Sequence, residues 1–185
     1  MNAPAPTIAV LSTSPALASI LGATLRRGHN WRVREFRDTR ALSAYMRIAP
    51  VAVLVADYAL ESATAADIAL ELRSDEMVVS RHVQIIALSR QVDLTMRQRC
   101  VRAGIDEVIM KPMSPLYLEE RVTARLRRPP HDHIACGPAY AGPERRGRVH
   151  VKDTRPIPIE RRSNGTNVVS FLAHKARLEN GRVEV

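Results

Sequence analysis

The stretch Val51-Ala52-Val53-Leu54-Val55-Ala56-Asp57 decides the fold class of this chain. Six apolar residues in a row, without polar alternation, are typical of a parallel strand that is covered on both faces. The run ends on a carboxylate, Asp57, and the chain on either side alternates short apolar runs with longer amphipathic ones. The sequence therefore predicts a buried central strand with a polar residue at its carboxyl end.

Four further short runs have the length and composition of strands, and five segments have helical spacing or helix-capping residues. The strands are expected at residues 7–11, 31–36, 83–88 and 107–110. The helices are expected to begin after cap residues Ser14, Thr39, Asp93 and Ser114, with a further helix over 65–73. Five strand–helix pairs predict an α/β fold: a doubly wound, five-stranded parallel sheet over residues 7–128.

Polar side chains follow several of these strands. In a doubly wound sheet, sites form beyond the carboxyl ends of the strands, where the strand order reverses. A carboxylate at such an end can act as a nucleophile toward a phosphoryl group, and a hydroxyl and an ammonium can hold the phosphoryl oxygens. The residues expected to converge at this edge are Ser12, Thr13, Asp57, Ser89 and Lys111.

Residues 7–128 resemble the receiver domain of two-component response regulators. The resemblance rests on Pro15, Asp57, Ser89, Ala103-Gly104 and Lys111-Pro112, each in its expected strand–helix context. It implies that Asp57 accepts phosphate from a histidine kinase or a phosphotransfer protein. It also implies that Ser89 binds and reports the phosphoryl group, and that Lys111 pairs with it.

The sequence departs from the family pattern at three places. In the family, two carboxylates after the first strand help to hold Mg²⁺, but here these positions are Ser12 and Thr13. The family's switch aromatic is replaced by Val108, and the loop Tyr58–Ser62 lacks the usual proline and glycine. Because Mg²⁺ prefers carboxylate oxygens, no cofactor is expected to bind. We expect a degenerate receiver that is not an enzyme.

Three other interpretations of the site stay open. Asp57 caps the turn that follows it, or Asp57 and Lys111 form a structural ion pair in a fold that only docks partners. Alternatively, Asp57 is a working phosphoacceptor, with a metal site completed by water and backbone carbonyls. The expected role is that of a signalling adaptor for a histidine kinase, a phosphotransfer protein or a downstream target. By resemblance, its binding face comprises residues 93–103, 107–110 and 114–127.

Length, charge and cysteine content narrow the class of protein. The chain has 185 residues, a formal net charge of +9 and two cysteines. It has no apolar run long enough to span a bilayer, no secretion signal and no disulfide framework, so a cytoplasmic protein is expected. Basic residues exceed acidic ones by 18 to 13 up to Arg128, and by 10 to 6 after it.

Residues 1–6 precede the first expected strand and are interpreted as an arm. Composition changes after Arg128, so residues 129–185 are interpreted as a largely extended tail, with a short helix near 168–178. The tail repeats a Glu-Arg-Arg triplet and resembles extensions that follow stand-alone receivers of α-proteobacteria. The arginines of the repeats are candidate anion ligands, for a nucleotide such as a cyclic dinucleotide. Docking onto the receiver's acidic residues and simple solvation are the alternatives, and nucleic-acid binding is not expected. These arginines are Arg145, Arg146, Arg161 and Arg162.

Overall fold

The computed structural model describes residues 4–127, 133–136, 140–143 and 168–169. Its central sheet has the five parallel strands that the sequence predicts, and the structure places them in the order β2-β1-β3-β4-β5. From β1 the chain adds β2 on one side, and it then adds β3, β4 and β5 on the other, so the strand order reverses between β1 and β3. The strands are β1 (Thr7–Leu11), β2 (Arg32–Phe36), β3 (Val53–Asp57), β4 (Gln84–Ser89) and β5 (Glu107–Met110).

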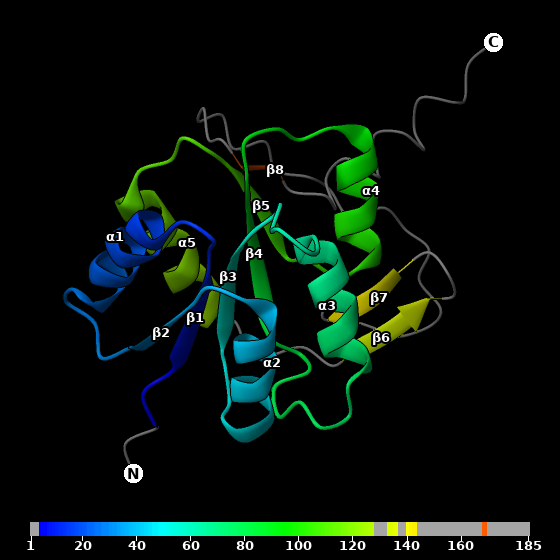
Figure 1. The fold of residues 1–185 in the computed structure, drawn as a ribbon, viewed down its shortest axis with the longest axis horizontal. Helices are drawn as coiled ribbons and strands as arrows, with labels where there is room; N and C mark the ends of the chain where they lie inside the picture. The colour runs from blue at the N-terminus through cyan, green and yellow to red at the C-terminus, as the bar shows by residue number, and fades with distance from the viewer. Residues whose placement is uncertain (1–3, 128–132, 137–139, 144–167, 170–185) are drawn as a thin grey trace.

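The five helices α1 to α5 cover the two faces of this sheet, as Figure 1 shows. Helices α1 and α5 cover one face of the sheet, and α2, α3 and α4 cover the other. Each face has its own buried apolar cluster. Period-two alternation divides the strand residues between the clusters: Leu54 faces α2–α4, whereas Val53 and Val55 face α1 and α5. The helices are α1 (Pro15–Arg26), α2 (Thr39–Ile48), α3 (Ala65–Ser74), α4 (Leu94–Arg102) and α5 (Pro115–Leu126).

Local capping chemistry sets most helix boundaries. Ser14 accepts a hydrogen bond from the Leu17 amide, and Ser114 caps α5 in the same way. The predicted cap at Thr39 is wrong: Asp38 accepts from the Ala41 amide at 2.8 Å, and Thr39 is the first helical residue. A carboxylate one residue earlier also interacts favourably with the positive end of the helix.

Three short strands lie outside the α/β unit. β6 (His133–Cys136) and β7 (Tyr140–Pro143) form an antiparallel pair, and β7 lies next to α4. β8 (Val168–Val169) pairs antiparallel with the outer edge of β5. The helix expected near 168–178 is therefore wrong at its first two residues, because their backbone joins the sheet. The rest of that range lies outside the described residues. No helix in the described ranges reaches the length and apolarity needed to cross a bilayer.

Cys100 lies on the buried side of α4 and is fully inaccessible. Burial raises the pKa of its thiol from 9.0 to about 12, so far less thiolate is present near neutral pH. We expect iodoacetamide at pH 8 to label Cys100 roughly 1,000-fold more slowly in the native protein than in urea, at about tenfold per pKa unit. Peptide mapping by mass spectrometry measures this rate; equal rates in both states would contradict the buried placement.

Candidate functional site

The carboxyl ends of β1 and β3 bring Ser12 and Asp57 together. These two strands are neighbours, with Leu11 opposite Ala56, and they flank the position where the strand order reverses. The Ser12 hydroxyl donates a 2.6 Å hydrogen bond to Oδ2 of Asp57. Both residues are nearly inaccessible, at 1% and 6% exposure. The sequence placed Ser12 at this edge but did not predict that it binds the carboxylate directly.

The other carboxylate oxygen is engaged by a lysine from the end of β5. Nζ of Lys111 lies 2.6 Å from Oδ1 of Asp57, and the lysine side chain is 22% exposed. A buried carboxylate is tolerated where it is paired and hydrogen-bonded. The ion pair that the sequence left open as an interpretation is therefore present, and each oxygen of Asp57 has a donor.

The Ser89 hydroxyl is bonded to its own turn rather than to the Asp57 carboxylate. It donates to the Gln91 carbonyl oxygen at 2.7 Å and accepts from the Gln91 amide, so it closes the turn after β4. Within the described residues, no hydrogen bond links Ser89 to Asp57. The sequence placed Ser89 at the correct edge, but the local turn, which depends on the backbone of residues 89–91, decides where its hydroxyl points.

The remaining predicted positions differ in exposure. Thr13 is exposed, so of the two residues after β1 only Ser12 is buried at the site. Val108 is fully buried opposite Ala87 and belongs to the core that faces α2–α4. Among the described residues, no cluster of three or more His, Cys, Asp or Glu side chains is arranged to hold a metal ion. The four tail arginines 145, 146, 161 and 162 lie outside the described residues.

A second buried carboxylate lies on β5 and was missed by the sequence interpretation. Glu107 is 1% exposed, and its two oxygens accept from the guanidinium groups of Arg121 and Arg125 on α5. The arginines are four residues apart and therefore share one helix face. A charged residue inside a short apolar strand, together with two arginines four residues apart on the following helix, was the sequence signal that could have predicted this cluster. The cluster attaches α5 to the sheet.

Comparison with known protein families agrees with this order of strands and helices. A family model for the response regulator receiver domain matches residues 8–123. The chain belongs to this family. Receiver domains act in two-component signalling, as signalling modules that interact with proteins such as histidine kinases.

The curated relatives match the receiver part alone. The chain is 33% identical over 122 residues to the DNA-binding response regulator MtrA of Mycolicibacterium smegmatis, covering 65% of this chain and 50% of that protein. It is 34% identical to MtrA of Mycobacterium leprae over the same length, covering 65% and 51%. The chain thus spans about half the length of the curated relatives it matches.

Solved structures agree on the fold. The chemotaxis response regulator CheY4 of Vibrio cholerae superimposes with a TM-score of 0.59 at 16% identity, covering 65% of this chain and 98% of that one. The DrrB receiver domain activated with BeF3 gives 0.58 at 21% identity, covering 67% and 99%. At these identities the similarity establishes the receiver fold alone.

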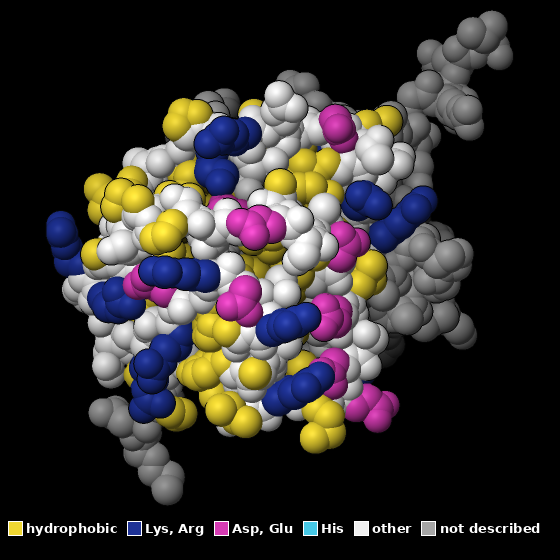
Figure 2. Space-filling view, viewed as in Figure 1, with side chains coloured by type: hydrophobic (Ala, Val, Ile, Leu, Met, Phe, Trp, Pro, Cys, Tyr) yellow, Lys and Arg dark blue, Asp and Glu magenta, His cyan; other side chains and the backbone are white. Residues whose placement is uncertain are grey.

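Charged side chains of both signs are mixed on one face of the receiver. Figure 2 shows Lys and Arg side chains interspersed with Asp and Glu over one face, rather than gathered into a patch. Among the described residues, several surface arginines are paired with carboxylates, for example Arg26 with Glu35 and Arg47 with Asp75. This face therefore does not present the continuous basic surface that is typical of nucleic-acid binding.

Proposed function

We propose that this chain is a degenerate receiver that acts as a protein-binding signalling adaptor without phosphorylation at Asp57. One observation carries the proposal: both oxygens of the acceptor-position carboxylate are occupied, one by the Ser12 hydroxyl and one by the Lys111 ammonium. A nucleophilic carboxylate needs a free oxygen directed at the phosphorus atom. In this protein a short hydrogen bond to Ser12 or Lys111 has to break before either oxygen of Asp57 can attack a phosphorus atom.

The chemistry of the donor set supports the same proposal. Mg²⁺ prefers anionic oxygen ligands, and the residues after β1 supply two hydroxyls, Ser12 and Thr13, in place of carboxylates. The Lys111 ammonium beside Asp57 already balances its charge. These residues do not fit a divalent cation, and the proposed adaptor role does not require one.

The proposed adaptor surface lies on the α4–β5–α5 side, which the family resemblance implies. Val108 has no ring to move between core and surface, and the Glu107–arginine cluster attaches β5 to α5. Both features favour a single fixed conformation of this side. A partner that uses the outer edge of β5 has to displace β8, which pairs there.

A phosphorylation assay tests the proposal. We expect intact mass spectrometry to detect no phosphoryl adduct after incubation with acetyl phosphate and Mg²⁺, because the carboxylate is engaged and lacks acidic neighbours. Asp57→Asn is the matched control and is likewise expected to show no phosphoryl adduct. An adduct on the unmodified chain that disappears in Asp57→Asn would overturn the proposal.

That opposite result would establish the second candidate, a functional phosphoacceptor. The observation that favours this candidate is the Lys111–Asp57 pair itself, at 2.6 Å, because the resemblance implies a lysine beside the acceptor of a working receiver. The two candidates differ in whether Ser12 is displaced from Oδ2. The mass measurement distinguishes them directly.

A further inference from the structure

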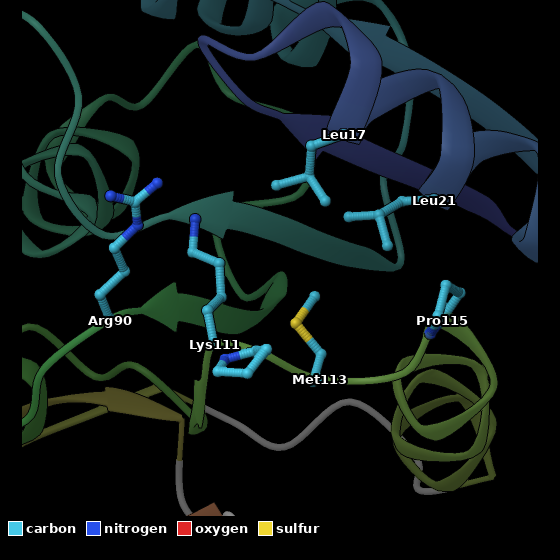
Figure 3. Close-up of a pocket in the computed structure, with 7 residues that line it drawn as sticks. Leu17, Leu21, Arg90, Lys111, Met113 and Pro115 are labelled. Atoms are coloured by element: carbon cyan, nitrogen blue, oxygen red, sulfur yellow. The ribbon is translucent and has the colours of Figure 1, made fainter.

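A groove of about 470 Å³ lies beside the Asp57–Lys111 pair, between α1 and the connection from β5 to α5. Leu17 and Leu21 of α1 form one wall, and Met113 and the flanking prolines form the other (Figure 3). Its volume lies within the range of small-molecule sites. The lining residues are Leu17, Leu21, Arg90, Lys111, Pro112, Met113 and Pro115.

The polar side chains of the groove are both cationic. In Figure 3 the side chains of Arg90 and Lys111 extend side by side, across from the leucines of α1. Among the described residues, no carboxylate lines the groove. Arg90 is exposed, and in the described part of the chain its guanidinium has no ion pair or hydrogen bond. The groove thus combines apolar walls with an available guanidinium at one end.

We propose that this groove binds a small amphipathic anion, a carboxylate or phosphate ester that carries an apolar chain or ring. Its head group is held by Arg90, whose planar guanidinium can donate two parallel hydrogen bonds to such an anion. Its apolar part lies against Leu17, Leu21 and Met113, where burial of apolar surface stabilises it. Charge and shape both favour this class of ligand over a neutral or cationic one.

Lys111 couples the groove to the receiver site, because it lines the groove while its Nζ is bonded to Oδ1 of Asp57. An anion in the groove competes with Asp57 for this one ammonium. By thermodynamic reciprocity, any change at Asp57 that releases Lys111 strengthens anion binding. Binding of an anion in the groove thus changes the contacts of Asp57 without phosphoryl transfer. This coupling does not depend on whether Asp57 accepts phosphate.

The direct test is a methyl NMR titration of the full chain with sodium octanoate. Octanol, which has the chain without the charge, and inorganic phosphate, which has the charge without the chain, are the matched probes. We expect octanoate to shift the methyl signals of Leu17, Leu21 and Met113 and to bind at least about tenfold more tightly than either probe, the effect of one charge-assisted contact. Equal binding of octanol, or shifts confined to other methyl groups, would overturn the proposal.

Two sets of variants separate the head-group contact from general charge. Arg90→Ala is expected to weaken octanoate binding about tenfold and to leave octanol unchanged. Arg40→Ala, which removes an exposed arginine from α2, is the control and is expected to change neither. Equal weakening by both variants would mean that octanoate senses only net charge, which contradicts the proposed contact.

The coupling has its own test. Asp57→Asn is expected to tighten octanoate binding about threefold or more, because a neutral amide no longer competes for Lys111. In a Lys111→Met background, Asp57→Asn is expected to change the octanoate affinity by less than about half of the fold-change that it causes when Lys111 is present. An unchanged affinity in Asp57→Asn, or an undiminished effect without Lys111, would overturn the coupling.

Discussion

The double substitution Ser12→Asp with Thr13→Asp is expected to give the protein Mg²⁺-dependent phosphorylation at Asp57. The expected rate is at least about 100-fold above that of the unmodified chain, which is the usual effect of one electrostatic element of a catalytic site. The side chain of residue 12 already lies against Oδ2 of Asp57. An aspartate there supplies the second carboxylate that a divalent cation prefers and removes the hydroxyl that occupies Oδ2. The readout is intact mass after incubation with acetyl phosphate, with and without Mg²⁺.

Thermal unfolding provides an independent measurement on the same variant. Without Mg²⁺, two carboxylates in contact repel each other, so we expect a lower melting temperature than for the unmodified chain. Adding Mg²⁺ is expected to recover it. Ser12→Asn with Thr13→Asn has similar side-chain size without the charge, and is expected to show neither phosphorylation nor a Mg²⁺-dependent melting temperature. A variant carrying both aspartates that ignores Mg²⁺ in both measurements would show that residues 12 and 13 are not what limits this site.

Replacing both Arg121 and Arg125 by methionine is expected to lower the free energy of unfolding by about 3–5 kcal/mol, because it leaves a buried charge without a partner. Glu107 is 1% exposed, and both of its oxygens are bonded to these arginines. Methionine keeps most of the apolar packing of the arginine stem, so the loss reports mainly on charge. Urea unfolding followed by circular dichroism measures it.

Adding Glu107→Met to that variant is the control, because it removes the unpaired carboxylate as well. A buried ion cluster replaced by apolar residues of similar volume is often neutral or stabilising. We therefore expect the variant with all three methionines to recover most of the lost stability. A loss below about 1 kcal/mol in the first variant, or no recovery in the second, would mean that Glu107 is hydrated rather than buried.

Much of the fold was predictable because its signals are local. Buried strands have continuous apolar runs, as in β3, and cap residues such as Ser14 and Asp93 mark helix starts whatever the rest of the chain does. Gly28 and Gly104 end their helices with φ of 73° and 70°, which favour glycine. The error at Thr39 is of one residue, because two adjacent residues can both act as caps.

The candidate site was predictable only as a set of residues at one sheet edge. Parallel topology brings Ser12, Asp57 and Lys111 together at one sheet edge, and the contacts of Asp57 come from the ends of strands that are far apart in the chain. The direction of the Ser89 hydroxyl depends on the turn after β4. Side-chain direction of this kind follows from torsion angles that the surrounding packing selects, so no spacing rule predicts it.

The sequence by itself determined the order of strands and helices along the chain, because this depends on residue type and local period. Its motif residues at the strand ends identified the receiver family, and it showed that Ser12 and Thr13 follow the first strand. Only the tertiary structure decided that Ser12 and Lys111 occupy both oxygens of Asp57, that Glu107 is buried between two arginines, and that Arg90 and Lys111 border a groove. These features join segments that are distant in sequence. Their geometry arises when the sheet and helices pack, and hydrogen-bond partners are then chosen by burial and distance rather than by neighbouring residues.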